Sequence, residues 1–112
     1  MPNYDFDEAA FNATKELMKD RFGILAEKYT RNAARYVQEV EQGILDEDAE
    51  KIIQGAHALK SSSAMLGFRG FQRCAVEIEA KARQGEIDLH EDIASLKNHL
   101  QHSLEVLGPY LE

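Results

Sequence analysis

Residues 22–42 read FGILAEKYTRNAARYVQEVEQ, and this stretch decides the fold. Its apolar side chains recur every three or four residues, which places them along one face of an α-helix. They are Phe22, Leu25, Tyr29, Ala33, Tyr36, Val37 and Val40, continued by Ile44. Because the repeat is sustained over about five turns, it predicts one long amphipathic helix over Phe22–Gln42.

Helical patterns also flank this stretch. Upstream, a shorter helix is predicted from about Asp7 to Lys19, after an Asp5/Glu8 pair with capping-box spacing. Downstream, the acidic run 46–48 favours the start of a third helix, which lasts until about Gly67.

Two more helices complete the pattern. The fourth carries Phe71, Cys74, Ala75, Ile78 and Ala82 and stops at Gly85. The fifth opens with Asp88 and Glu91 and sets Ile93, Leu96, Leu100, Leu104 and Leu107 along one stripe. The candidate helix ends are Gly43, Gly67, Gly70 and Gly85. Short connections favour antiparallel neighbours, so we predict an all-α fold: an antiparallel up-and-down four-helix bundle, with a short additional N-terminal helix covering one end.

Length and composition narrow the class of protein. The 112 residues predict a single domain over 1–112. Twenty acidic against 13 basic residues give a formal charge of −7, which argues against nucleic acid and anionic membranes as main partners. No apolar run reaches the roughly 20 residues of a membrane span. Cys74 is the only cysteine, so a multi-cysteine metal site is excluded. The first residues lack the pattern of a signal peptide, so a cytoplasmic location is expected. No second apolar face demands a partner helix, so we expect a monomer.

The third helix carries the candidate site. Its core stripe is Ile52, Ala56, Leu59, Ser63 and Leu66. At about 100° per residue, His57 lies about 140° from Ile52 and is predicted to point toward solvent. The outward neighbours of the histidine are Ile53, Lys60, Ser61, Ala64 and Phe68. This mixture of apolar and very small side chains predicts a docking surface; packing of Ile53 and Phe68 against the first helix is the equal alternative.

The residue types suit phosphoryl transfer. Imidazole with its ordinary pKa of about 6.5 is largely neutral near pH 7 and is then nucleophilic. Catalysis of phosphoryl transfer is mostly positioning and charge stabilisation. Lys60, at i+3 from His57, lies on the neighbouring ridge and could reach the phosphoryl oxygens. A bulky residue at position 61 would block a partner's approach to the ring.

The stretch AHALKSSSAMLGF, residues 56–68, closely resembles the signature of histidine phosphotransfer (HPt) domains of bacterial two-component phosphorelays. Downstream, Cys74, Ile78-Glu79 and residues 83–85 resemble the family's next helix. Upstream, the aromatic-rich helix over 22–42 and the acidic turn resemble the family's preceding hairpin, so the resemblance covers roughly residues 22–107.

The resemblance implies a phosphoryl carrier without cofactors. The sequence has no glycine-rich loop that could cradle the phosphates of ATP, so no ATP-dependent kinase activity of its own is expected. His57 would be phosphorylated on Nε2 and Lys60 would stabilise the phosphate. The partners would be receiver domains of a hybrid sensor kinase, of response regulators, or of both. Two positions depart from the family pattern: Ser61 stands where glycine is commoner, and Glu79 where some members have glutamine. Since a carboxylate cannot donate to phosphate, Arg83 is the expected auxiliary rather than Glu79.

Other functions remain alternatives. The strongest is a non-catalytic helical adaptor that binds partners through the same surface. A di-metal carboxylate bundle would need Glu-x-x-His pairs, which the sequence lacks. His99 and His102 form an i, i+3 pair on the last helix, but no carboxylates at matching spacing support a metal site there.

Overall fold

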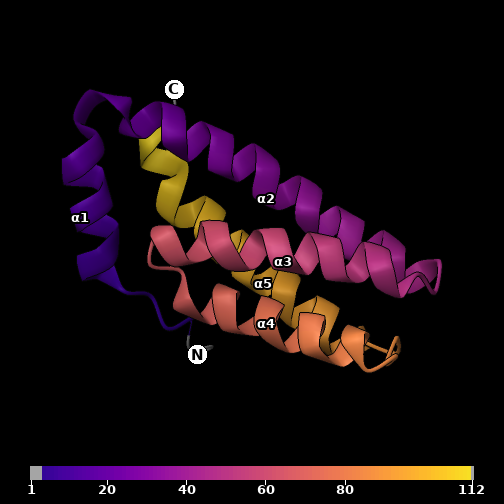
Figure 1. Ribbon diagram of the computed structural model, residues 1–112. Helices are drawn as coiled ribbons and strands as arrows, with labels where there is room; N and C mark the ends of the chain where they lie inside the picture. The colour runs from indigo at the N-terminus through magenta and orange to yellow at the C-terminus, as the bar shows by residue number, and fades with distance from the viewer. Residues whose placement is uncertain (1–3, 112) are drawn as a thin grey trace.

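The computed structural model describes residues 4–111, which are mostly helical (Figure 1). The elements are α1 (Glu8–Met18), the 3₁₀ turn η1 (Lys19–Arg21), α2 (Phe22–Leu45), α3 (Ala49–Met65), α4 (Arg69–Arg83), α5 (His90–Leu107) and the 3₁₀ turn η2 (Gly108–Tyr110). Helices α2 to α5 run alternately up and down along the longest dimension of a 42 × 26 × 19 Å molecule. Helix α1 lies across one end, so the predicted architecture is confirmed.

The core forms where the apolar stripes of α2 to α5 meet. The predicted stripe of α3 is confirmed: Ile52, Ala56, Leu59, Ser63 and Leu66 are fully buried. Ser63 is polar, but its hydroxyl lies 3.0 Å from the hydroxyl of Tyr29 on α2, so both groups are hydrogen-bonded. Burial raises the pKa of Tyr29 to about 12, so the phenol stays protonated.

Helices α2 and α3 are in close contact at two glycines. A Cβ at Gly55 would lie 2.8 Å from Val40 Cγ2 and 3.0 Å from the carbonyl oxygen of Tyr36. A Cβ at Gly43 would lie 2.8 Å from Ile52 Cγ1. The prediction that Gly43 ends its helix is wrong: α2 continues to Leu45, because this glycine makes room for α3 instead.

The true helix ends follow local hydrogen bonding. Gly67 and Gly85 have φ values of 79° and 85°, as expected for residues that terminate helices. Gly70, in contrast, lies in the first turn of α4 and ends no helix. The predicted Asp5/Glu8 capping box is also wrong, since Asp7 caps α1 by accepting from the Ala10 amide at 3.0 Å. At α3 the acidic run is confirmed as the helix start, with Asp48 as its cap.

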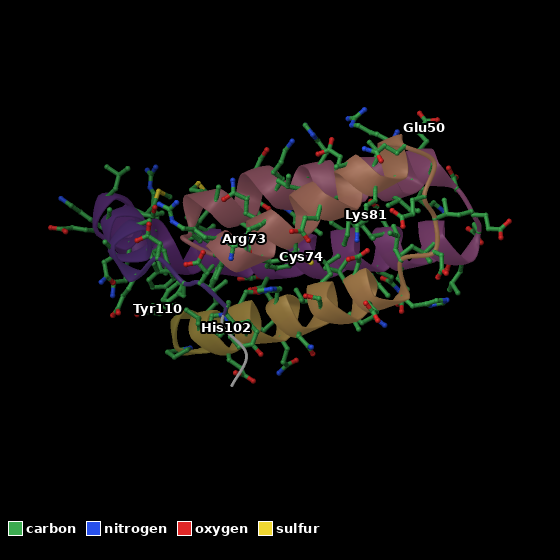
Figure 2. All side chains as sticks on the ribbon, turned by 90° about the horizontal axis from the view of Figure 1, so that it is seen from below. Glu50, Arg73, Cys74, Lys81, His102 and Tyr110 are labelled. Atoms are coloured by element: carbon green, nitrogen blue, oxygen red, sulfur yellow. The ribbon has the colours of Figure 1, made fainter. Side chains whose placement is uncertain are left out.

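A short N-terminal segment, residues 4–7, runs along the start of α4. Its backbone is joined to the bundle by bonds from Asp7 N to the Gly67 carbonyl, at 2.8 Å, and from Gly70 N to the Tyr4 carbonyl, at 3.2 Å. Ion pairs Asp5–Arg73 and Asp7–Arg69 add to these bonds. The Tyr4 ring stacks on His102 of α5, with ring centroids 4.2 Å apart. Figure 2 shows Arg73 and His102 toward the α1 end of the bundle, so this segment closes that end.

Candidate functional site

His57 lies near the middle of α3 and points away from the core. Its side chain is 60% exposed, whereas the neighbouring Ala56 is fully buried. The predicted outward orientation is therefore correct. A position in mid-helix also holds the imidazole on a rigid element rather than on a loop.

Glu79 of α4 is the centre of the site. Its carboxylate is 8% exposed and binds three side chains. Oε1 accepts from Lys60 Nζ at 3.0 Å, and Oε2 lies 3.2 Å from His57 Nδ1. Oε2 also accepts from Arg83 at 2.8 Å, one turn further along α4. The carboxylate thus joins α3 to α4 beneath the exposed imidazole.

Electrostatics decide the protonation of this cluster. The bond from Arg83, with those from Lys60 and His57, outweighs burial and lowers the pKa of Glu79 to about 2. An ionised carboxylate only accepts hydrogen bonds, so Nδ1 of His57 must be the donor. In the neutral ring the lone pair then lies on Nε2, the nitrogen left free by Glu79. The cluster selects the tautomer in which Nε2 is nucleophilic.

The cluster also carries one net positive charge, because Lys60 and Arg83 share a single carboxylate. Their side chains are 32% and 59% exposed, so both can reach a group at the surface. A phosphoryl group on the ring would find its counter-charges already in place.

Two shallow depressions lie on this side of α3, and one of them includes His57. The first, of about 390 Å³, is lined by His57, Lys60, Val76, Glu79, Ala80 and Arg83. The second is a groove of about 420 Å³ between α2 and α3, and it is mainly apolar. It is lined by Leu25, Lys28, Tyr29, Asn32, Tyr36, Ala58, Ser61, Ser62 and Met65. The small residues of α3, Ala58, Ser61 and Ser62, keep the groove open.

The predicted docking residues differ in exposure and fall into three groups. Ser61, Ala64 and Arg83 are exposed, as expected. Ile53 is half-buried against the core. The expectation of an exposed Phe68 is wrong: the side chain is 2% exposed and packs among Phe6, Phe11, Tyr29 and His102. Phe68 follows the end of α3, where the chain turns inward at Gly67.

The sequence analysis expected no role for Glu79, although this residue binds the other three side chains of the site. Its position one residue after the core residue Ile78 already marks a site at the edge of the buried face. An acidic residue there, with Arg83 at i+4, is a signal for a partly buried ion pair. The contact with His57 depends on the packing of α3 against α4, which periodicity does not show.

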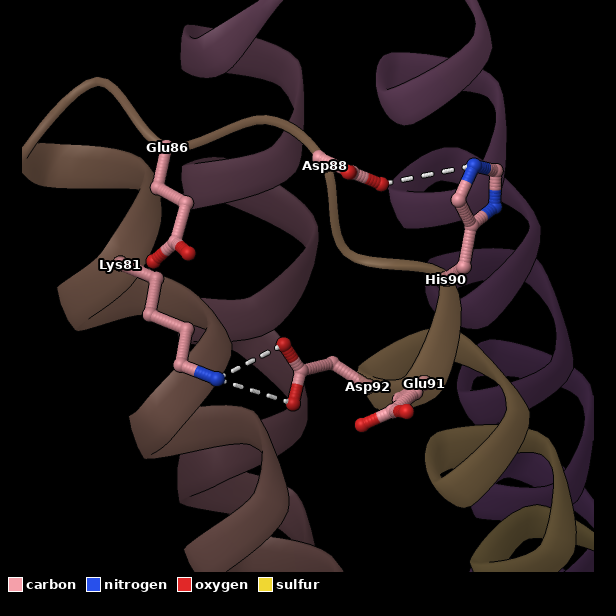
Figure 3. A pocket seen from close by; sticks show the side chains of 6 residues that line it. All are labelled: Lys81, Glu86, Asp88, His90, Glu91 and Asp92. Carbon is pink, nitrogen blue, oxygen red and sulfur yellow. Dashed lines mark hydrogen bonds and ion pairs between the residues drawn. The ribbon is translucent and has the colours of Figure 1, made fainter.

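A third hollow, at the far end of the molecule, has a different character (Figure 3). It is lined by Lys81, Glu86, Asp88, His90, Glu91 and Asp92, between the end of α4 and the start of α5. Its only lysine is held by Asp92, at 3.0 Å. Within residues 4–111 no group of three or more potential ligands is placed to hold a metal ion.

Comparisons with known proteins show the family and the fold. Residues 25–108 match the family model described as the Hpt domain. The fold is similar to that of histidine-containing phosphotransfer protein B (HptB) from Pseudomonas aeruginosa PAO1, with a TM-score of 0.89 and 17% sequence identity. That similarity covers 96% of this chain and 95% of the other. A search of curated protein sequences gives no match.

The chain therefore belongs to the Hpt domain family, the histidine phosphotransfer proteins of phosphorelay signalling. Proteins of this family are phosphoryl carriers rather than kinases, and they interact with receiver domains. Among the helices described here, none has the length and apolar character needed to cross a bilayer.

Proposed function

We propose that His57 is the carrier residue of this chain. It accepts a phosphoryl group on Nε2 from the aspartyl phosphate of one receiver domain and passes it to the aspartate of another. The observation that carries this proposal is the bond from Nδ1 to Glu79, which leaves Nε2 of an exposed ring as the free nucleophile. The donor would be a receiver of a hybrid sensor kinase, and the acceptor a response regulator or a further receiver.

The transfer step needs no cofactor. The lone pair of Nε2 attacks phosphorus, the bond between phosphorus and the aspartyl oxygen breaks, and the donor aspartate leaves as a carboxylate. Onward transfer is the reverse reaction with a second aspartate. Lys60 stabilises the charge on the equatorial oxygens during both steps, and Arg83 assists from α4.

The receiver would dock over His57 and the neighbouring α2–α3 groove. Ser61 and Ala64 allow its close approach because their side chains are small, and Ile53 contributes only the exposed part of its side chain. The chain would act as one domain over residues 1–112, as a monomer in the cytoplasm, where its single cysteine stays reduced. It would not take phosphate from ATP by itself.

Phosphoryl transfer from radiolabelled phospho-receiver domains tests this function. We expect acid-labile, base-stable label on the native protein and none on His57→Gln. An exposed histidine away from the cluster gives the matched control: His90→Gln should take label like the native protein. Binding of receivers without label on any form would instead support the adaptor function. ATP alone should give no label.

A further inference from the structure

Glu79 meets the reacting ring at the nitrogen that does not carry the phosphoryl group. Its two oxygens hold Lys60 Nζ at 3.0 Å, Arg83 at 2.8 Å and His57 Nδ1 at 3.2 Å. The Glu79 side chain is 8% exposed, so water competes little for these bonds. With a pKa near 2, it remains charged throughout the pH range of cells.

The proton on Nδ1 decides how readily a phosphorylated ring reacts. Once phosphorus is bound to Nε2, Nδ1 either keeps its proton or carries a lone pair. If Nδ1 is protonated, the ring leaves phosphorus as neutral imidazole. If it is not, the ring must leave as an imidazolate anion, which is a far poorer leaving group. The ionised Glu79 carboxylate contacts Nδ1 directly and can only accept a hydrogen bond, so this contact favours the protonated form.

We propose that Glu79 keeps Nδ1 of phosphorylated His57 protonated and so makes this chain a fast phosphoryl donor. This inference rests on the proposed function, because it takes His57 as the carrier. Glu79 is thus a positioning residue that acts through the imidazole and does not touch the phosphoryl group.

The full cycle then balances without any proton entering or leaving the ring. During loading, neutral imidazole attacks with its Nε2 lone pair while the proton stays on Nδ1. During transfer, a carboxylate oxygen of the acceptor attacks phosphorus and the P–Nε2 bond breaks. The electron pair of that bond returns to Nε2. The ring is again neutral, and Nδ1 still carries the same proton, which remains hydrogen-bonded to Glu79.

Glu79→Gln is the matched substitution, because it keeps the size of the side chain and removes the charge. Its amide can donate to an unprotonated Nδ1 and so stabilises the slow form of the phosphorylated ring. Glu77→Gln, on the exposed side of the same helix, is the control for a lost charge in α4.

Each protein is loaded with phosphoramidate, a small donor that needs no partner, and the reagent is then removed. The decay of phosphohistidine is followed by ³¹P NMR from pH 6 to pH 9, with His57→Gln subtracted as background. We expect the phosphohistidine of the native protein and of Glu77→Gln to decay rapidly even at pH 8. Glu79→Gln should retain its phosphoryl group about tenfold longer at that pH.

Superimposable pH profiles for native protein and Glu79→Gln would overturn the inference. A second measurement does not depend on any variant: ¹⁵N NMR of the phosphorylated native ring should show Nδ1 protonated at pH 8, and an unprotonated Nδ1 would also overturn it. Because loading needs no receiver, a failure of receivers to donate tests the proposed function separately.

Discussion

At the scale of single residues, the site joins groups from two helices through one carboxylate. Lys60 comes from α3 and Arg83 from α4, and Glu79 holds both beside the ring. Glu79 therefore both orients the imidazole and places the two cations. Residues that touch the phosphoryl group and the residue that positions them should respond differently to substitution.

Lys60→Ala removes a cation expected to bind the phosphoryl oxygens. We expect loading from a phospho-receiver to slow about tenfold, because a charge-assisted hydrogen bond contributes on the order of 1.5–3 kcal/mol and less when partly exposed. Rapid-quench measurement of label on His57 checks this. Lys51→Ala is the control, since Lys51 lies on the same helix and pairs with Asp46 instead. Equal rates for both variants would contradict a role for Lys60.

Glu79 also links the site to acid stability. Its pKa is about 2 in the folded protein against an ordinary 4.5, so folding is favoured above pH 4.5 and this contribution is lost as the pH falls toward 2. We expect Glu79→Gln to be less stable than the native protein at pH 6. That difference should narrow by about 1–2 kcal/mol at pH 3, after allowance for the exposure of the partners. Urea unfolding at both pH values measures it, and Glu77→Gln should show no such narrowing.

At the scale of elements, the helices and their core faces were predictable from the sequence. The stripe from Phe22 to Val40 and that of α3 each repeat with helical spacing, and burial follows from this repeat alone. Gly43 was misread because its role depends on Ile52 of another helix. Phe68 was misread because the aromatic residues that cover it come from α1, α2, α5 and the N-terminal segment. What sequence periodicity cannot show is which side chains of different elements meet.

The close contact between α2 and α3 gives a prediction at this scale. Gly55→Ala should destabilise the protein by about 1–2 kcal/mol, because separating the helices costs more than the roughly 1 kcal/mol gained in helix propensity. Thermal unfolding checks this expectation. Gly108→Ala is the control, since a Cβ there meets no atom within 4 Å. A Gly55→Ala protein as stable as the native one would mean that the two helices adjust freely.

The groove between α2 and α3 gives a second prediction at this scale. Ser61→Trp should leave the fold intact, because position 61 is exposed, but should block a receiver from the ring. We expect binding measured by calorimetry to weaken at least tenfold. Gln101→Trp, an exposed position on α5, diagonally across the bundle, should bind normally. If Ser61→Trp bound the receiver as tightly as the native protein, the docking surface would lie elsewhere.

At the scale of the whole molecule, the end covered by α1 depends on two half-buried histidines. Burial lowers the pKa of His99 and of His102, while Arg73 lowers that of His99 further and Glu105 opposes the shift at His102. His102 stacks on Tyr4, and His99 stacks on Phe71 with centroids 6.1 Å apart. These contacts join the N-terminal segment to α5 and α4.

Stability should therefore fall as the pH drops below about 6.5, because the unfolded chain takes up protons that the folded chain resists. Between pH 7.5 and 5.5 we expect a loss of about 1 kcal/mol that is absent from the His99→Gln/His102→Gln double variant. Thermal unfolding across this range measures the slope, with His90→Gln as the control for an exposed histidine. If stability changed equally with pH in all three proteins, folding would not change the pKa of either histidine.

The contact between α1 and η2 has a consequence for protein engineering. Lys15 donates to the Tyr110 hydroxyl at 3.2 Å, and the ring of Tyr110 also packs on Phe11. Both described ends of the chain thus lie at the same end of the bundle, away from the α2–α3 turn (Figures 1 and 2). Figure 1 marks these ends on opposite sides of that end of the bundle, so a linker that joins them must cross its width. New ends opened near Glu47 would then give a circular permutant with the His57 surface unchanged.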